Sequence, residues 1–272
     1  MNVINTNIGA MKATNASNQA GKALGTAMER LSTGKRINSA KDDAAGLAIS
    51  NTMTAQIKGM NQGIRNANDG ISMAQTAEGA LGEVTNMLQR IRELAVQSAS
   101  GTYSADDRTS MNAEVTALVT QMTNIIDNTE FNGSNLFDGT AGASGTVTIQ
   151  AGANAADTVE LTLSDLTGVY GAAFAVDTAA NASTAMASVD AQLTVVNTAR
   201  GGLGASQNQL ESAVTNLGNN ITNLSDARSR IEDTDYSAES TALAKAQILS
   251  QASGAMLAQA NQSQQNVLSL LR

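Results

Sequence analysis

The chain has 272 residues, carries a formal net charge of −8 and contains no cysteine, histidine, proline or tryptophan. Without cysteine and histidine it can form neither disulfides, nor Cys/His zinc sites, nor histidine-dependent catalytic triads, and it has no glycine-rich phosphate-binding motif. Its acidic balance argues against a nucleic-acid surface, and no apolar run approaches the ~20 residues that span a bilayer. We therefore expect no catalytic, cofactor-binding or metal-binding residues, no nucleic-acid partner and no insertion into a membrane.

The first thirty residues predict an amphipathic helix that is apolar on more than one side. A row of small residues includes Ala20 and Ala27. The larger apolar residues are Ile4, Ile8, Met11, Leu24, Met28 and Leu31. This segment lacks the basic start and apolar stretch of an ordinary signal peptide. The protein is therefore either cytoplasmic or exported by a dedicated route.

Residues 44–99 predict one long helix, which the absence of proline permits. Apolar residues from Met53 to Ala74 alternate spacings of four and three, the pattern of a coiled-coil seam, and the seam continues after a one-residue shift from Ala77 to Ala95. Ser39 is predicted as the N-cap because an acidic residue, Asp42, follows three positions later. Such a helix is roughly 84 Å long at about 1.5 Å per residue, so it needs long partners.

A shorter helix and a β-hairpin are predicted next. Ser104 and Asp107 form the capping pattern of a helix that the polar stretch NTEFNGSN closes. The segments TVTIQ and TVELTL then alternate apolar and polar residues around AGANAAD, which predicts a hairpin within about residues 140–170. This is the only convincing strand signal in the sequence, and the following TGVYGAAFAVDT is predicted to be irregular.

Two further helices complete the chain. The four–three spacing returns from Met186 to Ile231, although Gly201, Gly202 and Gly204 interrupt it, which indicates either a weak point or close packing against another backbone. The last helix is predicted from about Ser237 to Leu271. Ala246, Ser253, Ala260 and Val267 form its centre line. Leu249, Met256 and Leu270 lie on one side of this line, and Leu257 and Leu271 lie on the other.

The order of these elements is palindromic, so the chain is expected to fold back on itself. We predict a mainly α fold: a long antiparallel coiled-coil helical rod with paired N- and C-terminal helices and a small β-hairpin region. Residues 1–43 and 232–272 would form a terminal-helix domain, and residues 44–231 a rod domain. One partner helix can cover one apolar seam, whereas the terminal helices are apolar over a wider arc. Their remaining surface therefore predicts contacts with other molecules.

Dense stretches at both ends resemble bacterial flagellin, the subunit of the flagellar filament. The N-terminal half contains RLSTGKRINSAKDDAAGLAIS, RNANDGISMAQTAEGAL and LQRIRELAVQS. The C-terminal half contains NNITNLSDARSRIEDTDYSAE, KAQILSQASGAMLAQANQ and NVLSLLR. The resemblance covers roughly residues 2–137 and 186–272, and it implies a minimal flagellin without the large outer domains that family members often carry. One departure is ARGGLGA, where a non-glycine residue is expected after the arginine.

The resemblance implies a structural, non-enzymatic protein used for swimming motility. The subunit would be exported unfolded by the flagellar type III apparatus and secreted, and it would polymerise at the filament tip beneath a cap. Its implied partners are copies of itself, an export chaperone, the export apparatus, the cap and the hook–filament junction proteins. The residues implied for the filament core and for the chaperone interface are Ile4, Ile8, Met11, Leu24, Met28, Leu31, Leu249, Met256, Leu257, Val267, Leu270 and Leu271.

The resemblance also implies recognition by the animal Toll-like receptor for flagellin, through Gln89, Arg90, Leu94 and Glu114. The alternative is that Leu94 is a core or interface residue and Arg90 a solvated or intersubunit charge. The charged elbow STGKRINSAKDD likewise has two interpretations. It is either a solvated connector between helices or an intersubunit contact in which Lys35, Arg36 and Lys41 meet carboxylates of a neighbour.

Three other functions are weighed against the filament subunit. A hook–filament junction protein would share the terminal helices. A cytoplasmic coiled-coil oligomer would explain the heptads but not the termini, and it predicts a discrete stoichiometry. A hydrolase is the weakest alternative, because the chain lacks histidine and every catalytic motif sought.

Overall fold

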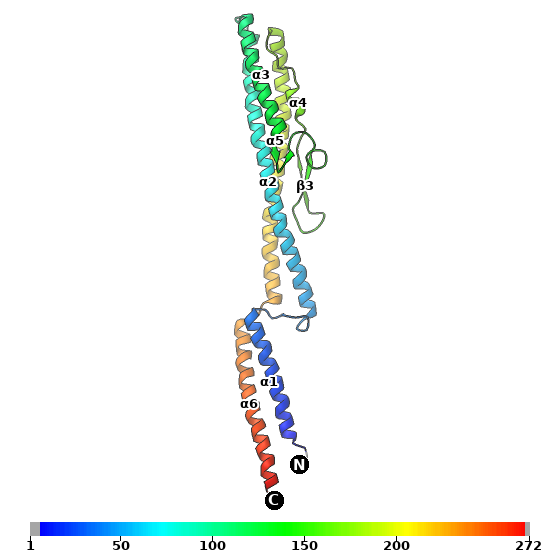
Figure 1. Ribbon diagram of the computed structural model, residues 1–272, viewed down its shortest axis with the longest axis vertical. Coiled ribbons are helices and arrows are strands. Elements are labelled where there is room, and N and C mark those ends of the chain that lie inside the picture. Colours follow the sequence, from blue (N-terminus) through cyan, green and yellow to red (C-terminus); the bar gives the residue numbers. More distant parts are fainter. Residues whose placement is uncertain (1–5, 270–272) are drawn as a thin grey trace. The chain divides into compact units, whose positions relative to one another are not determined.

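The computed structural model describes residues 6–269, and the side chains of residues 6–265. The predicted mainly α fold with paired long helices is confirmed. The chain forms two compact units, one made of residues 1–55 and 223–272 and the other of residues 56–222. Figure 1 shows the course of the chain. The helices are α1 (Ile8–Thr33), α2 (Ala44–Ala99), α3 (Ala105–Asn128), α4 (Thr167–Tyr170), α5 (Ala179–Glu232) and α6 (Tyr236–Ser269). The strands are β1 (Glu130–Phe131), β2 (Ser134–Asn135), β3 (Thr146–Gln150) and β4 (Thr158–Thr162).

The core of the 56–222 unit lies along the seam between α2 and α5, with α3 packed beside them (Figure 1). The seam predicted on α2 is confirmed, because all its members from Ala77 to Ala95 are buried. On α5 the predicted seam is also buried or half-buried along its length. Ion pairs flank the apolar contact at the surface, such as the 2.7 Å contact of Arg92 Nε with Asp190 Oδ1.

Much of this core comes from segments without helical periodicity. The side chains of Leu136, Phe137, Leu161, Leu166 and Val176 are almost fully buried between the helices. Polar contacts fix the last of these segments: Ser98 Oγ donates to the Val176 carbonyl oxygen, and Val176 N–H donates to Asn112 Oδ1 at 2.9 Å. The prediction of irregular structure for residues 167–178 was thus wrong in part, because this segment begins with the short helix α4, and its Val176 belongs to the core.

The predicted hairpin is confirmed, and β3 pairs with β4 in an antiparallel register that places Thr148 opposite Glu160. The prediction of a single strand region was wrong, because β1 and β2 form a second hairpin where the sequence predicted only a helix terminator. Asn132 and Gly133 both have positive φ, 52° and 77°. Asn-Gly is the residue pair that a two-residue hairpin turn prefers, so this signal was present in the sequence.

The β3–β4 hairpin packs against α2 at a position where the helix has a glycine. A Cβ added at Gly63 would lie 2.7 Å from the Ala151 carbonyl oxygen, so the close approach of the two backbones requires glycine there. The glycines of α5 differ, because a Cβ added at Gly201, Gly202 or Gly204 meets nothing within 4 Å. Close packing at these positions is therefore excluded within the described chain, and α5 runs through them without a break.

The predicted N-cap of α2 was wrong. Ser39 and Asp42 bond to each other in the turn that precedes the helix, with Ser39 N–H donating to Asp42 Oδ2 at 2.9 Å. Asp43 occupies the capping position instead, and its Oδ1 accepts from Gly46 N–H at 2.8 Å. The capping box predicted for α3 is confirmed, with Ser104 as its N-cap and Asp107 as the reciprocal acceptor.

A candidate assembly surface on the terminal helices

In the unit formed by the two chain ends, α1 and α6 pack along a narrow seam. Two polar contacts show that the helices are antiparallel: Asn7 Nδ2 donates to the Ala260 carbonyl oxygen at 3.0 Å, and Arg30 lies 3.6 Å from Glu239. The buried and half-buried residues repeat with spacings of three and four. Among the described side chains they are Ala10, Ala13, Ser17, Ala20, Leu24, Ala27, Arg30 and Leu31 on α1, and Glu239, Ser240, Leu243, Ala246, Ser250, Ser253, Leu257, Ala260 and Gln264 on α6.

Small residues dominate this seam, and the large apolar residues are mostly outside it. Leu24, Leu31 and Leu257, which the sequence analysis assigned to an interface, are half-buried inside the seam. The exposed members of the assigned set are Ile8, Met11, Met28, Leu249 and Met256. Ile4, Leu270 and Leu271 lie outside the described residues, as does the side chain of Val267. Ile248 and Tyr236, which were not predicted to belong to an interface, are also exposed.

Four of the exposed apolar residues, Met11, Met28, Leu249 and Met256, lie on two opposite faces of the helix pair. Met11 and Met28 each follow a seam residue, whereas Leu249 and Met256 each precede one. One residue turns an α-helix by about 100°, and in an antiparallel pair these two offsets point to opposite faces. The second face is hollowed into a groove of about 490 Å³, with Gly9, Ala13, Ala16, Met256 and Ala260 in its wall.

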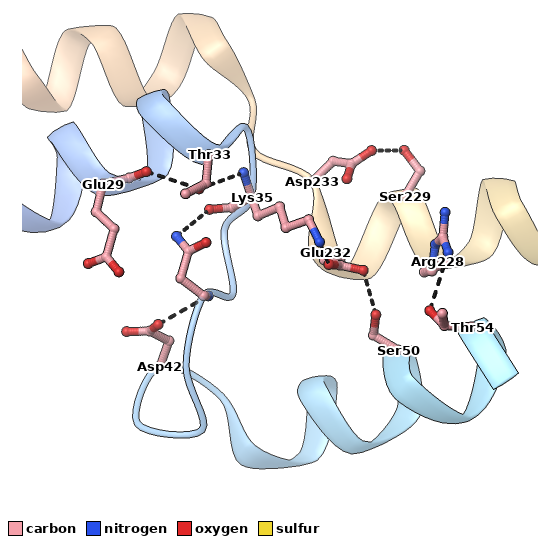
Figure 2. A network of polar contacts seen from close by, with 11 residues as sticks. Glu29, Thr33, Lys35, Asp42, Ser50, Thr54, Arg228, Ser229, Glu232 and Asp233 are labelled. Atoms are coloured by element: carbon pink, nitrogen blue, oxygen red, sulfur yellow. Dashed lines mark hydrogen bonds and ion pairs between the residues drawn. The ribbon is translucent and has the colours of Figure 1, made fainter.

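A polar network at the elbow holds the start of α2 against the end of α5 (Figure 2). Glu232 is its centre: its carboxylate contacts Lys35 Nζ and accepts from Ser50 Oγ at 2.5 Å, and its carbonyl oxygen accepts from Arg36 N–H at 2.7 Å. The bonds from Lys35 first, and then from Ser50, lower the pKa of Glu232. Next to it, Arg228 Nη1 donates to Thr54 Oγ1 at 3.2 Å.

This network bears on the two interpretations of the charged elbow. Lys35 pairs with Glu232 of its own chain, and Arg36 Nη2 donates to the Ile231 carbonyl oxygen at 2.7 Å. Both cations therefore have partners within the chain, as a connector between helices requires. Lys41 is exposed and makes no ion pair with the residues that the structure describes.

The residues assigned to receptor recognition lie on α2 and α3 of the other unit. The Arg90 guanidinium donates to Glu114 Oε1 at 2.9 and 2.8 Å and to Glu93 Oε2 at 3.0 Å. These carboxylates, Glu114 before Glu93, raise the pKa of Arg90. Gln89, Arg90 and Glu114 are exposed, whereas Leu94 is only 2% exposed. Leu94 therefore supports the helix from the core side and presents almost no surface of its own.

Within residues 6–269 no cluster of acidic side chains could hold a metal ion. Over the same residues, none of the helices combines the length and the apolar character that crossing a bilayer needs.

Two family models cover most of the sequence. The model for the bacterial flagellin N-terminal helical region matches residues 4–142, and the model for the bacterial flagellin C-terminal helical region matches residues 186–271. The chain belongs to the bacterial flagellins. It is thus a structural, non-enzymatic subunit of the extracellular flagellar filament, and it polymerises with copies of itself.

Known flagellins agree with this assignment over the whole chain. A flagellin of Halalkalibacterium halodurans is 48% identical over 277 residues, covering 99% of this chain and all of that protein. Flagellin D of Vibrio anguillarum is 36% identical over 375 aligned positions, covering 98% of this chain and 99% of that protein. Because this chain has 272 residues, the Vibrio flagellin is longer. The chain is therefore a short flagellin without a large variable domain.

Solved structures agree at the level of the fold. The crystal structure of Bacillus cereus flagellin superposes with a TM-score of 0.52 at 32% identity, covering 56% of this chain and 88% of that one. A putative flagellar hook-associated protein from Vibrio parahaemolyticus reaches a TM-score of 0.61 at 14% identity, covering 71% of this chain and all of that one. At that identity the second likeness concerns the fold alone. The full-length similarity to flagellins decides against the junction protein.

Proposed function

We propose that the two apolar faces of the α1–α6 pair are the surface through which this flagellin polymerises. The observation that carries this proposal is the distribution of side chains in the pair. Small residues fill the seam within the chain, while Met11, Met28, Leu249 and Met256 remain exposed on opposite faces. Exposed apolar residues that gather on one element of a soluble protein commonly mark an interaction site.

The placement of these residues on opposite faces favours an open polymer over a closed dimer. A single two-fold partner covers one face and leaves the other in water, whereas a subunit inside a helical array has neighbours on several sides. Burying each half-exposed methionine or leucine contributes on the order of 1 kcal/mol. Each subunit contributes several such residues, so the stability of the array depends on all of them together.

Substitution of Met256 tests this assignment. Met256→Gln keeps the length of the side chain but places a polar amide in the groove wall, and Met256→Leu is the matched control that keeps the surface apolar. Electron microscopy of purified monomer with short filament seeds should show filaments from the control and strongly reduced elongation from Met256→Gln. Because Met256 is exposed, both variants should retain the circular dichroism of the unmodified monomer. Equal elongation of the two variants would refute the assignment.

Removal of residues 265–272 tests the end of the same helix. Val267, Leu270 and Leu271 are part of the interface implied by the family resemblance, and the truncated chain lacks all of them. We expect the chain ending at Gln264 to lose seeded elongation. A truncated chain that elongates like the full one would restrict the interface to the residues before position 265.

The subunit is proposed to travel to the filament tip unfolded, through the flagellar export apparatus, and to assemble there beneath the cap. Hook–filament junction proteins are further proposed partners. The apolar side chains of α6 would have to be masked in the cell. We assign this masking to the export chaperone at the exposed Leu249 and Met256 and at Leu257, which is half-buried in the folded pair. Calorimetric titration of the chaperone should give weaker binding with Met256→Gln than with Met256→Leu. Equal affinity of the two variants would place the chaperone elsewhere.

We further propose that the exposed cluster of Gln89, Arg90 and Glu114 is recognised by the animal Toll-like receptor for flagellin. The Arg90–Glu114 contacts support this proposal because they hold a charged pair in a fixed position across α2 and α3. Leu94 is 2% exposed, and we assign it the role of supporting this stretch of α2 from the core side.

A further inference from the structure

The methionines of the α1–α6 pair differ in exposure from the rest. Met11, Met28 and Met256 are 60%, 57% and 64% exposed. All other methionines among the described residues are buried or half-buried, namely Met53, Met60, Met73, Met87, Met111, Met122 and Met186. Exposure of the thioether therefore selects the three residues that lie on the proposed assembly surface.

We propose that Met11, Met28 and Met256 form an oxidation-sensitive site that controls the assembly of the free subunit. This proposal rests on the assembly surface proposed above. The oxidant is a peroxide. The Sδ lone pair attacks one peroxide oxygen, an S–O bond forms, the O–O bond breaks, and the proton of the transferred oxygen passes to the leaving hydroxide, which departs as water. Sulfur loses two electrons and the peroxide gains them.

The product changes the surface on both faces at once. Methionine sulfoxide is polar and chiral, whereas the thioether is apolar and adapts to irregular surfaces. At Met256 the new oxygen lies in the wall of the groove, which is otherwise lined by Gly9, Ala13, Ala16, Ala252 and Ala260 together with Lys12, Ser253, Gln259 and Ser263. Burying it against a neighbour without a hydrogen-bond partner is unfavourable. Oxidation of Met11 and Met28 makes the same change on the opposite face, so both apolar faces of the pair become more polar.

Two features separate this modification from random damage. Methionine oxidation is reversible, because the two methionine sulfoxide reductases each reduce one epimer of the sulfoxide. In addition, the site is closed by assembly itself, since a neighbouring subunit covers the thioethers in the filament. The oxidised form therefore accumulates in free subunits, and reduction returns them to the assembling pool.

The experiment treats purified monomer with dilute hydrogen peroxide, adds filament seeds, and separates pellet from supernatant. Peptide mass spectrometry then measures the sulfoxide fraction at each methionine in both samples. We expect sulfoxide to form first at Met11, Met28 and Met256, and to be depleted at these positions in the pellet. Treatment with both reductases should restore elongation. Similar oxidation at Met87 and Met122, or equal sulfoxide fractions in pellet and supernatant, would overturn the proposal.

A variant with Met11→Leu, Met28→Leu and Met256→Leu gives the matched control. Leucine keeps these positions apolar and cannot be oxidised in this way, so the variant should elongate equally before and after peroxide. Loss of its elongation on peroxide treatment would move the sensitive site elsewhere and overturn the proposal. The underlying assembly surface is tested separately by Met256→Gln without any oxidant. If Met256→Gln blocks elongation but peroxide-treated monomer elongates normally, the oxidation proposal is refuted and the proposed assembly surface is not.

Discussion

The two units of this flagellin bury different kinds of side chain. The 56–222 unit encloses large residues such as Leu81, Leu88 and Ile91, all inaccessible to water. Among its described side chains, the α1–α6 pair fully buries Ala20, Ala27 and Ala246. Its four described leucines Leu24, Leu31, Leu243 and Leu257 are half-buried, and its other large apolar residues are exposed. Burial of apolar area is the main favourable term in folding. The first unit is therefore stabilised by its own core, whereas the α1–α6 pair leaves apolar surface that neighbouring subunits would cover in the proposed assembly.

The largest expected difference concerns core residues of the 56–222 unit. Leu88→Ala should lower the free energy of unfolding of this unit by about 2–5 kcal/mol, because it leaves a cavity in a fully buried seam. Met28→Ala, on an exposed face of α1, should change monomer stability by no more than about 0.5 kcal/mol. Urea denaturation followed by circular dichroism measures both. A comparable loss from Met28→Ala would show that the terminal pair has a substantial core of its own.

Two glycines of the 56–222 unit have different surroundings, so their substitution by alanine should have opposite effects on stability. Gly63→Ala forces a Cβ against the Ala151 backbone and should cost about 1–3 kcal/mol. Gly202→Ala adds a Cβ in open space on a helix and should stabilise α5 by up to about 1 kcal/mol. Opposite shifts of the unfolding midpoint are expected. A loss of stability from both substitutions would show that other atoms occupy the space around Gly202 in the monomer in solution.

Acidification tests the elbow at the base of the terminal helices. The pKa of Glu232 is lowered by Lys35 and Ser50, so the ionised carboxylate stabilises the folded elbow. This contribution is present above the ordinary value of 4.5 and is lost as the pH falls through the lowered pKa of the folded state. Below pH 4.5, the unfolding temperature of the Glu232→Gln monomer should depend less on pH than that of the unmodified monomer. A parallel loss of stability in variant and parent would assign the acid sensitivity to other groups.

The smallest effect on stability is expected at Arg90. Its ion pairs with Glu93 and Glu114 are exposed, and such pairs contribute little to folding. Arg90→Ala should therefore leave the unfolding midpoint almost unchanged while it abolishes the response of cells that report on the Toll-like receptor. Arg92→Ala, which removes a similar exposed pair with Asp190, is the matched control and should retain the response. No response to the unmodified protein would refute the receptor assignment.

Periodic helices were predictable because their information is local. The seam from Ala77 to Ala95 and the capping box at Ser104 follow from spacing alone. The missed β1–β2 hairpin carried an Asn-Gly turn signal, but its strands are too short to show alternation. The N-cap of α2 was misplaced because Ser39, Asp42 and Asp43 all have suitable side chains, and only the path of the chain selects Asp43.

The sequence by itself determined the helices, the main hairpin and the family, because heptad spacing and long matching segments need no knowledge of contacts. Only the tertiary structure decided which apolar residues face a partner within the chain. Leu24 and Met28 lie four residues apart and are similar in sequence pattern, yet Leu24 enters the seam and Met28 stays exposed. The physical reason is that a helix pair buries one narrow stripe, and the register of packing against α6 selects which stripe it is.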